Sequence, residues 1–173
     1  MPFGKGKAYA ADASRLVDTL IGGWELAPNF EWQTGFYWTP LAGEDIANAV
    51  VGAMRPDRLC NGKISNRTAA EWFNPNCFTN DILLAGQTNG IYRFGNSGRS
   101  IIEGPGIFNL DMGVYKNFDL SERFKMEFRA EFFNILNHAN FNGMSMSLTS
   151  GSTGQLTGAM DGRDIQFALK LTF

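Results

Sequence analysis

The last eleven residues of the chain, 163–173, alternate strictly between apolar and mainly polar side chains. An extended chain places alternate side chains on opposite faces. The apolar positions are Ile165, Phe167, Leu169, Leu171 and Phe173. A strand of this length, alternating up to a terminal aromatic residue, is about what a bilayer requires of a tilted strand in a barrel wall. The pattern therefore predicts a strand with water on one face and hydrocarbon on the other.

Three more segments alternate in the same way, and we predict strands at about 24–38, 107–118, 123–133 and 163–173. Trp24 and Trp38 are spaced so that they mark the two interfaces of a membrane. Pro28 cannot donate to a ladder, so it belongs at a bulge or beside a missing neighbour. The connections are long, very short and long again: about 41–106, a tight turn at 119–122, and about 134–162. Short turns at one rim and long loops at the other are typical of membrane barrels.

The fold class predicted is therefore all-β, an antiparallel transmembrane β-barrel fragment with about four long strands and two long outer loops. To keep both apolar stripes on one face, the strands at 107–118 and 123–133 must pair residues of the same parity. One such register places Asp111 opposite Arg129, and the next one places it opposite Glu131, which is a like-charge pair. We predict the first register.

Composition agrees with a strand-rich membrane protein and argues against other classes. The chain has 15 Phe, 4 Trp and 4 Tyr alongside 20 Gly, a combination seen in β proteins that pack or embed aromatic side chains. No apolar run approaches the roughly 18 residues of a membrane helix, so a bilayer would be crossed by strands. The net charge is −2 and no basic block is present, so nucleic acid is not an expected partner.

The two cysteines, Cys60 and Cys77, lie in the region with the least periodic structure. They are either two unrelated thiols or, in an oxidising compartment, a disulfide that closes the loop. We predict the disulfide, which would contribute about 3 kcal/mol by the loop-closure argument. With one histidine in the whole chain, their spacing does not make a zinc site. No metal and no cofactor are expected.

Five charged residues share the polar parity of the two central strands: Asp111, Lys125, Glu127, Arg129 and Glu131. They form either a salt-bridge lattice on a wet wall or paired carboxylates for acid/base chemistry, and we predict the lattice. His138 is the only imidazole, and no serine lies in a nucleophile elbow that would make it a catalytic base. We interpret it as a hydrogen-bonding loop residue and expect no enzyme activity.

Short motifs are distributed along nearly the whole chain. They are Pro2-Phe-Gly-Lys-Gly-Lys7, Gly22-Gly-Trp24, Thr34-Gly35, Arg55-Pro56, Trp72-Phe-Asn74, Phe94-Gly-Asn96, Gly104-Pro-Gly106, Phe108-Asn-Leu-Asp111, Lys116-Asn-Phe118, Phe128-Arg-Ala-Glu-Phe-Phe-Asn134, Asn137-His138, Asn140-Phe141, Arg163 and Leu169-Lys-Leu-Thr-Phe173. In this order they resemble the C-terminal end of the Oar-like TonB-dependent receptors. In these outer-membrane proteins a carboxypeptidase-regulatory-like domain and a plug precede a large barrel.

The resemblance implies an outer-membrane location in a Gram-negative-type bacterium and a role in capturing and importing a ligand. It implies that the plug, the segment that contacts TonB and most strands lie upstream of Met1, so that this chain is a fragment that does not transport alone. The partners implied are outer-membrane lipid, the barrel-assembly machinery, the rest of the barrel and plug, and TonB. The assembly signal would include Phe167, Leu169, Leu171 and Phe173. The long loop places Arg55, Arg58, Trp72 and Tyr92 within reach of a ligand.

A second function remains open from the sequence. The same alternation fits a soluble β-sandwich carbohydrate-binding module, in which the apolar stripes meet in a dry core. Trp72, Phe73 and Tyr92 would then stack on sugars. Partition between membrane and aqueous fractions separates this reading from the receptor reading.

Overall fold

A computed structural model of the chain describes residues 1–173 except 53, 120 and 122. The chain forms two units. The strand unit consists of Met1–Trp32, Phe108–His138 and Asp161–Phe173, and the loop unit consists of Gln33–Ile107 and Ala139–Met160. Among the described residues, no helix is long and apolar enough to cross a bilayer.

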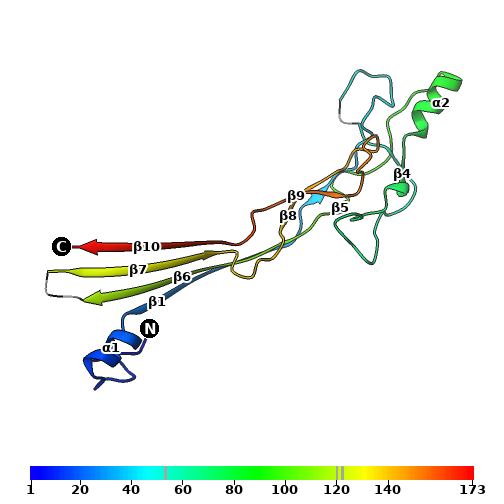
Figure 1. Cartoon of the computed structure of the whole chain (residues 1–173). Coiled ribbons are helices and arrows are strands. Elements are labelled where there is room, and N and C mark those ends of the chain that lie inside the picture. The colour runs from blue at the N-terminus through cyan, green and yellow to red at the C-terminus, as the bar shows by residue number, and fades with distance from the viewer. Residues whose placement is uncertain (53, 120, 122) are drawn as a thin grey trace. The chain divides into compact units, whose positions relative to one another are not determined.

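The strand unit contains the four long strands (Figure 1). They lie in the order β1-β6-β7-β10, with bounds Trp24–Gln33, Ile107–Asp119, Lys125–Phe133 and Asp164–Thr172. The last three strands lie close to their predicted positions. The helix α1, Arg15–Ile21, precedes β1 and begins where the Ser14 hydroxyl accepts a hydrogen bond from the N–H of Val17.

Pairing between β7 and β10 places their apolar side chains on one face, as predicted. Leu169 lies opposite Phe128, Phe167 opposite Ala130 and Leu171 opposite Met126. Because side chains alternate along each strand, this register places the polar side chains of both strands on the opposite face. The sheet is therefore amphipathic across its strands.

Strand β1 is an edge strand of this sheet, which explains how it tolerates a proline in its interior. The N–H of Asn117 in β6 donates to the carbonyl oxygen of Gly23 (3.0 Å), and the ring of Phe30 packs edge-on against Phe108, with the centroids 5.4 Å apart. The two strands therefore run antiparallel. Pro28 has β6 on one side of its strand only.

The register predicted between β6 and β7 is wrong by four residues, although its parity is right. Tyr115, rather than Asp111, lies opposite Arg129, and Glu131 lies opposite Gly113. β6 ends one residue later than predicted and β7 begins two residues later, and the pairing closes with Asp119 opposite Lys125. The predicted turn includes residues 120 and 122, which lie outside the described residues. Packing of the Tyr115 ring against Arg129, 5.4 Å from ring centroid to guanidinium carbon, takes the place of the ion pair we expected.

The strand predicted at 24–38 is divided in two. β1 ends at Gln33, and Tyr37–Trp38 form β2, which pairs with β5, Ile102–Glu103. At the break the backbones touch, because a Cβ on Gly35 would lie 1.9 Å from the carbonyl oxygen of Gly104. The next residue, Pro105, has no N–H to give to a ladder. The close approach of Gly35 to Gly104 and the missing N–H of Pro105 together interrupt strand pairing between Gln33 and Tyr37.

The loop unit is folded, contrary to the prediction of a structureless connection at 41–106. Besides β2 and β5 it contains the strands β3 (Asp57–Arg58), β4 (Phe78–Thr79), β8 (Phe141–Met144) and β9 (Leu156–Ala159), the 3₁₀ helix η1 (Pro75–Cys77) and the helix α2 (Asp81–Asn89). One core cluster comprises Phe73, Cys77, Phe78, Ile102, Met144 and Met146. A second comprises Ala42, Ile46, Met54 and Ile82. Both predicted loops, 41–106 and 134–162, contribute to the first core.

Cys60 and Cys77 form the predicted disulfide, with their Cα atoms 4.8 Å apart and a sequence separation of 17. Cys77 belongs to the first core cluster, and the backbone N–H of Leu59 donates to the carbonyl oxygen of Cys77 (2.7 Å). The disulfide thus joins the exposed segment around Cys60 to the first core cluster. A structural disulfide indicates an oxidising compartment, such as the periplasm or the cell surface.

Candidate functional site

The apolar face of the strand unit is open. Phe167, Leu169 and Leu171 of β10 are 68%, 60% and 62% exposed, and Phe30 and Trp32 of β1 are 60% and 70% exposed. Soluble proteins rarely expose contiguous apolar surface of this kind. An outward apolar band bounded by aromatic residues is what the wall of a membrane barrel presents to lipid.

Lys116 is a buried cation that our sequence reasoning missed. It occupies an apolar-parity position of β6, opposite Phe128, yet it is buried. Its ammonium donates to the carbonyl oxygen of Gly22 and lies 5.1 Å from the ring centroid of Trp24 and 5.3 Å from that of Phe118. Lysine stems pack on apolar surface while the charge turns to polar partners and aromatic faces. The sequence signal was a cation among apolar even-numbered residues from 108 to 118.

The polar face of the sheet carries a network built around Tyr115. The Tyr115 hydroxyl donates to the carboxylate of Glu131 (3.2 Å), and the guanidinium of Arg129 lies over its ring and pairs with Glu127. Tyr115 also covers Gly113, where an added Cβ would lie 2.6 Å from the hydroxyl oxygen. An aromatic ring over a strand glycine replaces packing that the glycine lacks.

The structure therefore brings together three of the five predicted network residues: Glu127, Arg129 and Glu131. Lys125 is the first residue of β7 and lies opposite Asp119 and Thr172. Asp111 accepts hydrogen bonds from the side-chain amide of Asn109 and from the backbone N–H of Asn134, both 2.9 Å. These bonds fix the carboxylate of Asp111 beside the C-terminal end of β7, and Asp111 lines one pocket with Tyr115 and Glu131.

The four loop residues that we predicted near a ligand contact different parts of the loop unit. The Arg58 guanidinium donates to the carbonyl oxygen of Cys60 (2.7 Å). The Trp72 indole donates to the carbonyl oxygen of Glu103 (2.8 Å) and packs against the first core. The ring of Tyr92 packs on Gly86 of α2, and Arg55 lines a cavity together with Arg99. Among the described contacts, these four side chains share no common neighbour that would make them one site.

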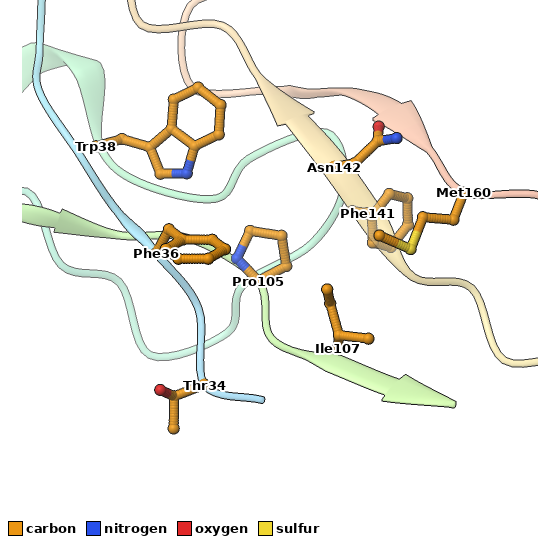
Figure 2. A pocket seen from close by; sticks show the side chains of 8 residues that line it. All are labelled: Thr34, Phe36, Trp38, Pro105, Ile107, Phe141, Asn142 and Met160. Atoms are coloured by element: carbon orange, nitrogen blue, oxygen red, sulfur yellow. The ribbon is translucent and has the colours of Figure 1, made fainter. Parts of the chain in front are cut away.

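A second feature that the sequence did not reveal is an apolar cavity of about 140 Å³ in the loop unit (Figure 2). Its lining comes from the segment after β1, from Pro105 and the start of β6, from β8 and from the end of β9: Thr34, Phe36, Trp38, Pro105, Ile107, Phe141, Asn142 and Met160. Six of these side chains are apolar. A cavity of this size and lining suits a small apolar group, such as an aromatic ring or the end of an acyl chain.

An ion pair holds two distant segments of the loop unit together. Arg93 donates to both carboxylate oxygens of Asp57, with 2.9 Å to Oδ1, and the N–H of Asn96 also donates to Oδ1 (3.0 Å). The hydrogen bond from Arg93 lowers the pKa of Asp57, with help from Asn96 and against the opposing effect of burial. The same contact raises the pKa of Arg93.

The lowered pKa makes the loop unit sensitive to acid. Unfolded Asp57 binds a proton at its ordinary pKa of about 3.9, while folded Asp57 binds it at a lower pH. The stabilisation is therefore fully present above about pH 4 and is lost as the pH falls through the folded pKa. We expect the amide protection factors near residues 57 and 96, which are corrected for the intrinsic exchange rate at each pH, to fall over this window. Asp57→Asn should lack this portion of the change, and equal acid sensitivity in both proteins would contradict the role of the pair.

Fold and surface together define a class: an antiparallel sheet with one exposed apolar face and one polar face, in a chain with a disulfide-bonded loop unit, is typical of a segment of an outer-membrane β-barrel. The family model described as "Outer membrane beta barrel domain" matches residues 1–166, and the chain belongs to this family. Its location is the outer membrane. Neither the curated proteins nor the solved structures contain a match to the chain.

The soluble β-sandwich reading is wrong. Its apolar stripes would have to meet in a dry core, but the side chains of β1 and β10 are exposed. Phe73, which that reading places on a sugar, is 1% exposed and belongs to the first core. The family match places the chain in the outer membrane instead.

Proposed function

We propose that the chain forms part of the wall and outer loops of a TonB-dependent receptor that captures a ligand and imports it. The ordered motifs that resemble the Oar-like receptors support the import role. The folded loop unit supports the capture role, because ligand-binding surfaces are usually loops held by a rigid scaffold. The disulfide between Cys60 and Cys77 and the two core clusters supply that rigidity here.

In this proposal the two faces of the sheet have different surroundings. Phe128 and Phe167 face lipid, while the network of Glu127, Arg129 and Glu131, with Asp111 and Lys125 near its ends, lines the lumen. Other parts of the receptor supply the plug and the contact with TonB, so this chain does not transport alone. We propose no catalytic step for this chain.

The experiment for the import role is cross-linking to TonB in intact cells. Antibodies against the loop unit should recover, from outer-membrane fractions treated with formaldehyde, an adduct that also reacts with antibodies against TonB. The same adduct should be missing from a strain without TonB. A receptor that stays in the outer membrane but never yields this adduct would disprove the TonB-dependent role and leave the barrel assignment intact.

A further prediction concerns the proposed assembly signal. Deleting Phe173 from the full-length receptor should lower the amount inserted, because the terminal aromatic residue is part of what we propose the assembly machinery recognises. Heat-modifiable migration of the outer-membrane fraction on gels measures insertion. Phe173→Tyr, which keeps the aromatic ring, is the matched control and should insert normally. Equal insertion of the deletion variant would refute the signal.

A further inference from the structure

Two arginines of the loop unit, Arg55 and Arg99, line one cavity. The cavity has a volume of about 360 Å³ and is lined by Thr39, Leu41, Arg55 and Arg99. Among the described residues, neither guanidinium of this pair makes a hydrogen bond or an ion pair. Both therefore keep their full set of donors.

The other three arginines of the loop unit behave differently. Arg58 donates to the carbonyl oxygen of Cys60, Arg67 pairs with Glu103 (3.5 Å), and Arg93 pairs with Asp57. Folding gives each of these three arginines a protein partner. Among the described residues, Arg55 and Arg99 have none, so contacts within the fold do not account for their position at one cavity. Their shared cavity leaves room for a ligand beside both guanidinium groups.

Contacts between backbone segments place the Cα atoms of the two arginines beside the same cavity. A Cβ on Gly95 would lie 2.1 Å from the carbonyl oxygen of Arg55, so glycine permits the close approach of these segments. The N–H of Ser97 donates to the carbonyl oxygen of Pro56 (3.0 Å), and the N–H of Ser100 donates to the Thr39 hydroxyl (2.8 Å). The segment that carries Arg99 is thus fixed beside Arg55 before any ligand arrives, and such preorganisation lowers the cost of binding.

We propose that this arginine cavity, formed by Thr39, Leu41, Arg55 and Arg99, binds the carboxylate or phosphate group of a free anionic solute. A guanidinium presents a planar fork of N–H donors that matches these groups with two parallel hydrogen bonds. The Thr39 hydroxyl can donate a further bond, while Leu41 gives an apolar wall. The anion site rests on this geometry, and only its use in ligand capture rests on the proposed receptor function.

The test is calorimetric titration of the full chain, folded in an uncharged detergent, with pyrophosphate and with citrate. We expect saturable binding that weakens as salt is added. Arg55→Gln together with Arg99→Gln should weaken it about tenfold or more, because the variant loses the charge-assisted hydrogen bonds of both guanidinium groups. Arg58→Gln, one charge change in the same unit at a guanidinium outside the cavity, should leave the affinity unchanged.

A second pair of variants keeps the test decisive if the double glutamine variant does not fold. Arg55→Lys with Arg99→Lys retains both charges and loses both forks, so it should bind more weakly than the natural chain and more tightly than the glutamine variant. Absence of binding to the natural chain, or an equal loss in Arg58→Gln, would overturn the proposal. So would binding to micelles containing phosphatidylglycerol without binding to either free anion.

The outcome is separable from that of the TonB experiment. If the receptor forms the TonB adduct but the chain binds no anion, the import role stands and the anion site is refuted. If the chain binds pyrophosphate or citrate through Arg55 and Arg99 but the protein never contacts TonB, the anion site stands and the TonB-dependent role is refuted.

Discussion

Phe128→Arg should destabilise the full-length barrel by about 2–4 kcal/mol, the cost of a cation on the lipid face near the middle of the bilayer. Phe128 lies near the centre of β7, opposite Leu169 of β10, and its ring stacks on Phe167 with the centroids 6.2 Å apart. The arginine would lose this contact and face hydrocarbon. The measurement is the free energy of unfolding of the receptor in lipid vesicles.

Gln166→Arg is the matched control, since it adds the same side chain to the other face of the sheet. Gln166 lies opposite Glu131, so the new cation meets a carboxylate. We expect a change of at most about 1 kcal/mol there, as for an exposed ion pair. If both substitutions cost the same, or if Phe128→Arg assembled with unchanged heat stability, the assignment of the two faces would be wrong.

The long strands were predictable because each one alone carries its signal. A period of two over nine or more residues, as in β6, β7 and β10, requires no knowledge of the rest of the chain. The pairing register between β6 and β7 was harder to predict from the sequence. Charge pairing favoured Asp111 opposite Arg129, whereas the ring of Tyr115 over Gly113 and Arg129 decides the observed alignment. Local packing of one aromatic side chain outweighed an ion pair in a wet environment.

The loop unit was not predictable because its order is nonlocal. The first core joins Phe73 and Ile102 to Met144 and Met146, which come from both long connections, so neither connection shows a period of its own. The two cysteines were the exception, since their chemistry predicted a contact without any periodicity. Arg99 carried no signal at all, because its place beside Arg55 depends on contacts of Gly95, Ser97 and Ser100.

Phe73→Ala should remove about 3–5 kcal/mol from the stability of the loop unit, as large-to-small substitutions of buried aromatic residues do. Phe73 is 1% exposed and meets the ring of Phe78 edge-on, with the centroids 6.0 Å apart. Its removal leaves a cavity that the disulfide at Cys77 keeps from collapsing fully. Amide hydrogen exchange across residues 72–79 of the full chain measures the loss.

Phe94→Ala is the same substitution at a side chain that is 63% exposed in the same unit, and it should change protection by about 0.5 kcal/mol or less. A folded loop unit predicts this contrast, because only the buried ring gives up packing. A pair of flexible loops predicts fast exchange in the natural chain and no effect of either substitution. Equal exchange in Phe73→Ala, Phe94→Ala and the natural chain would therefore reject the rigid platform on which ligand capture and the arginine cavity both depend.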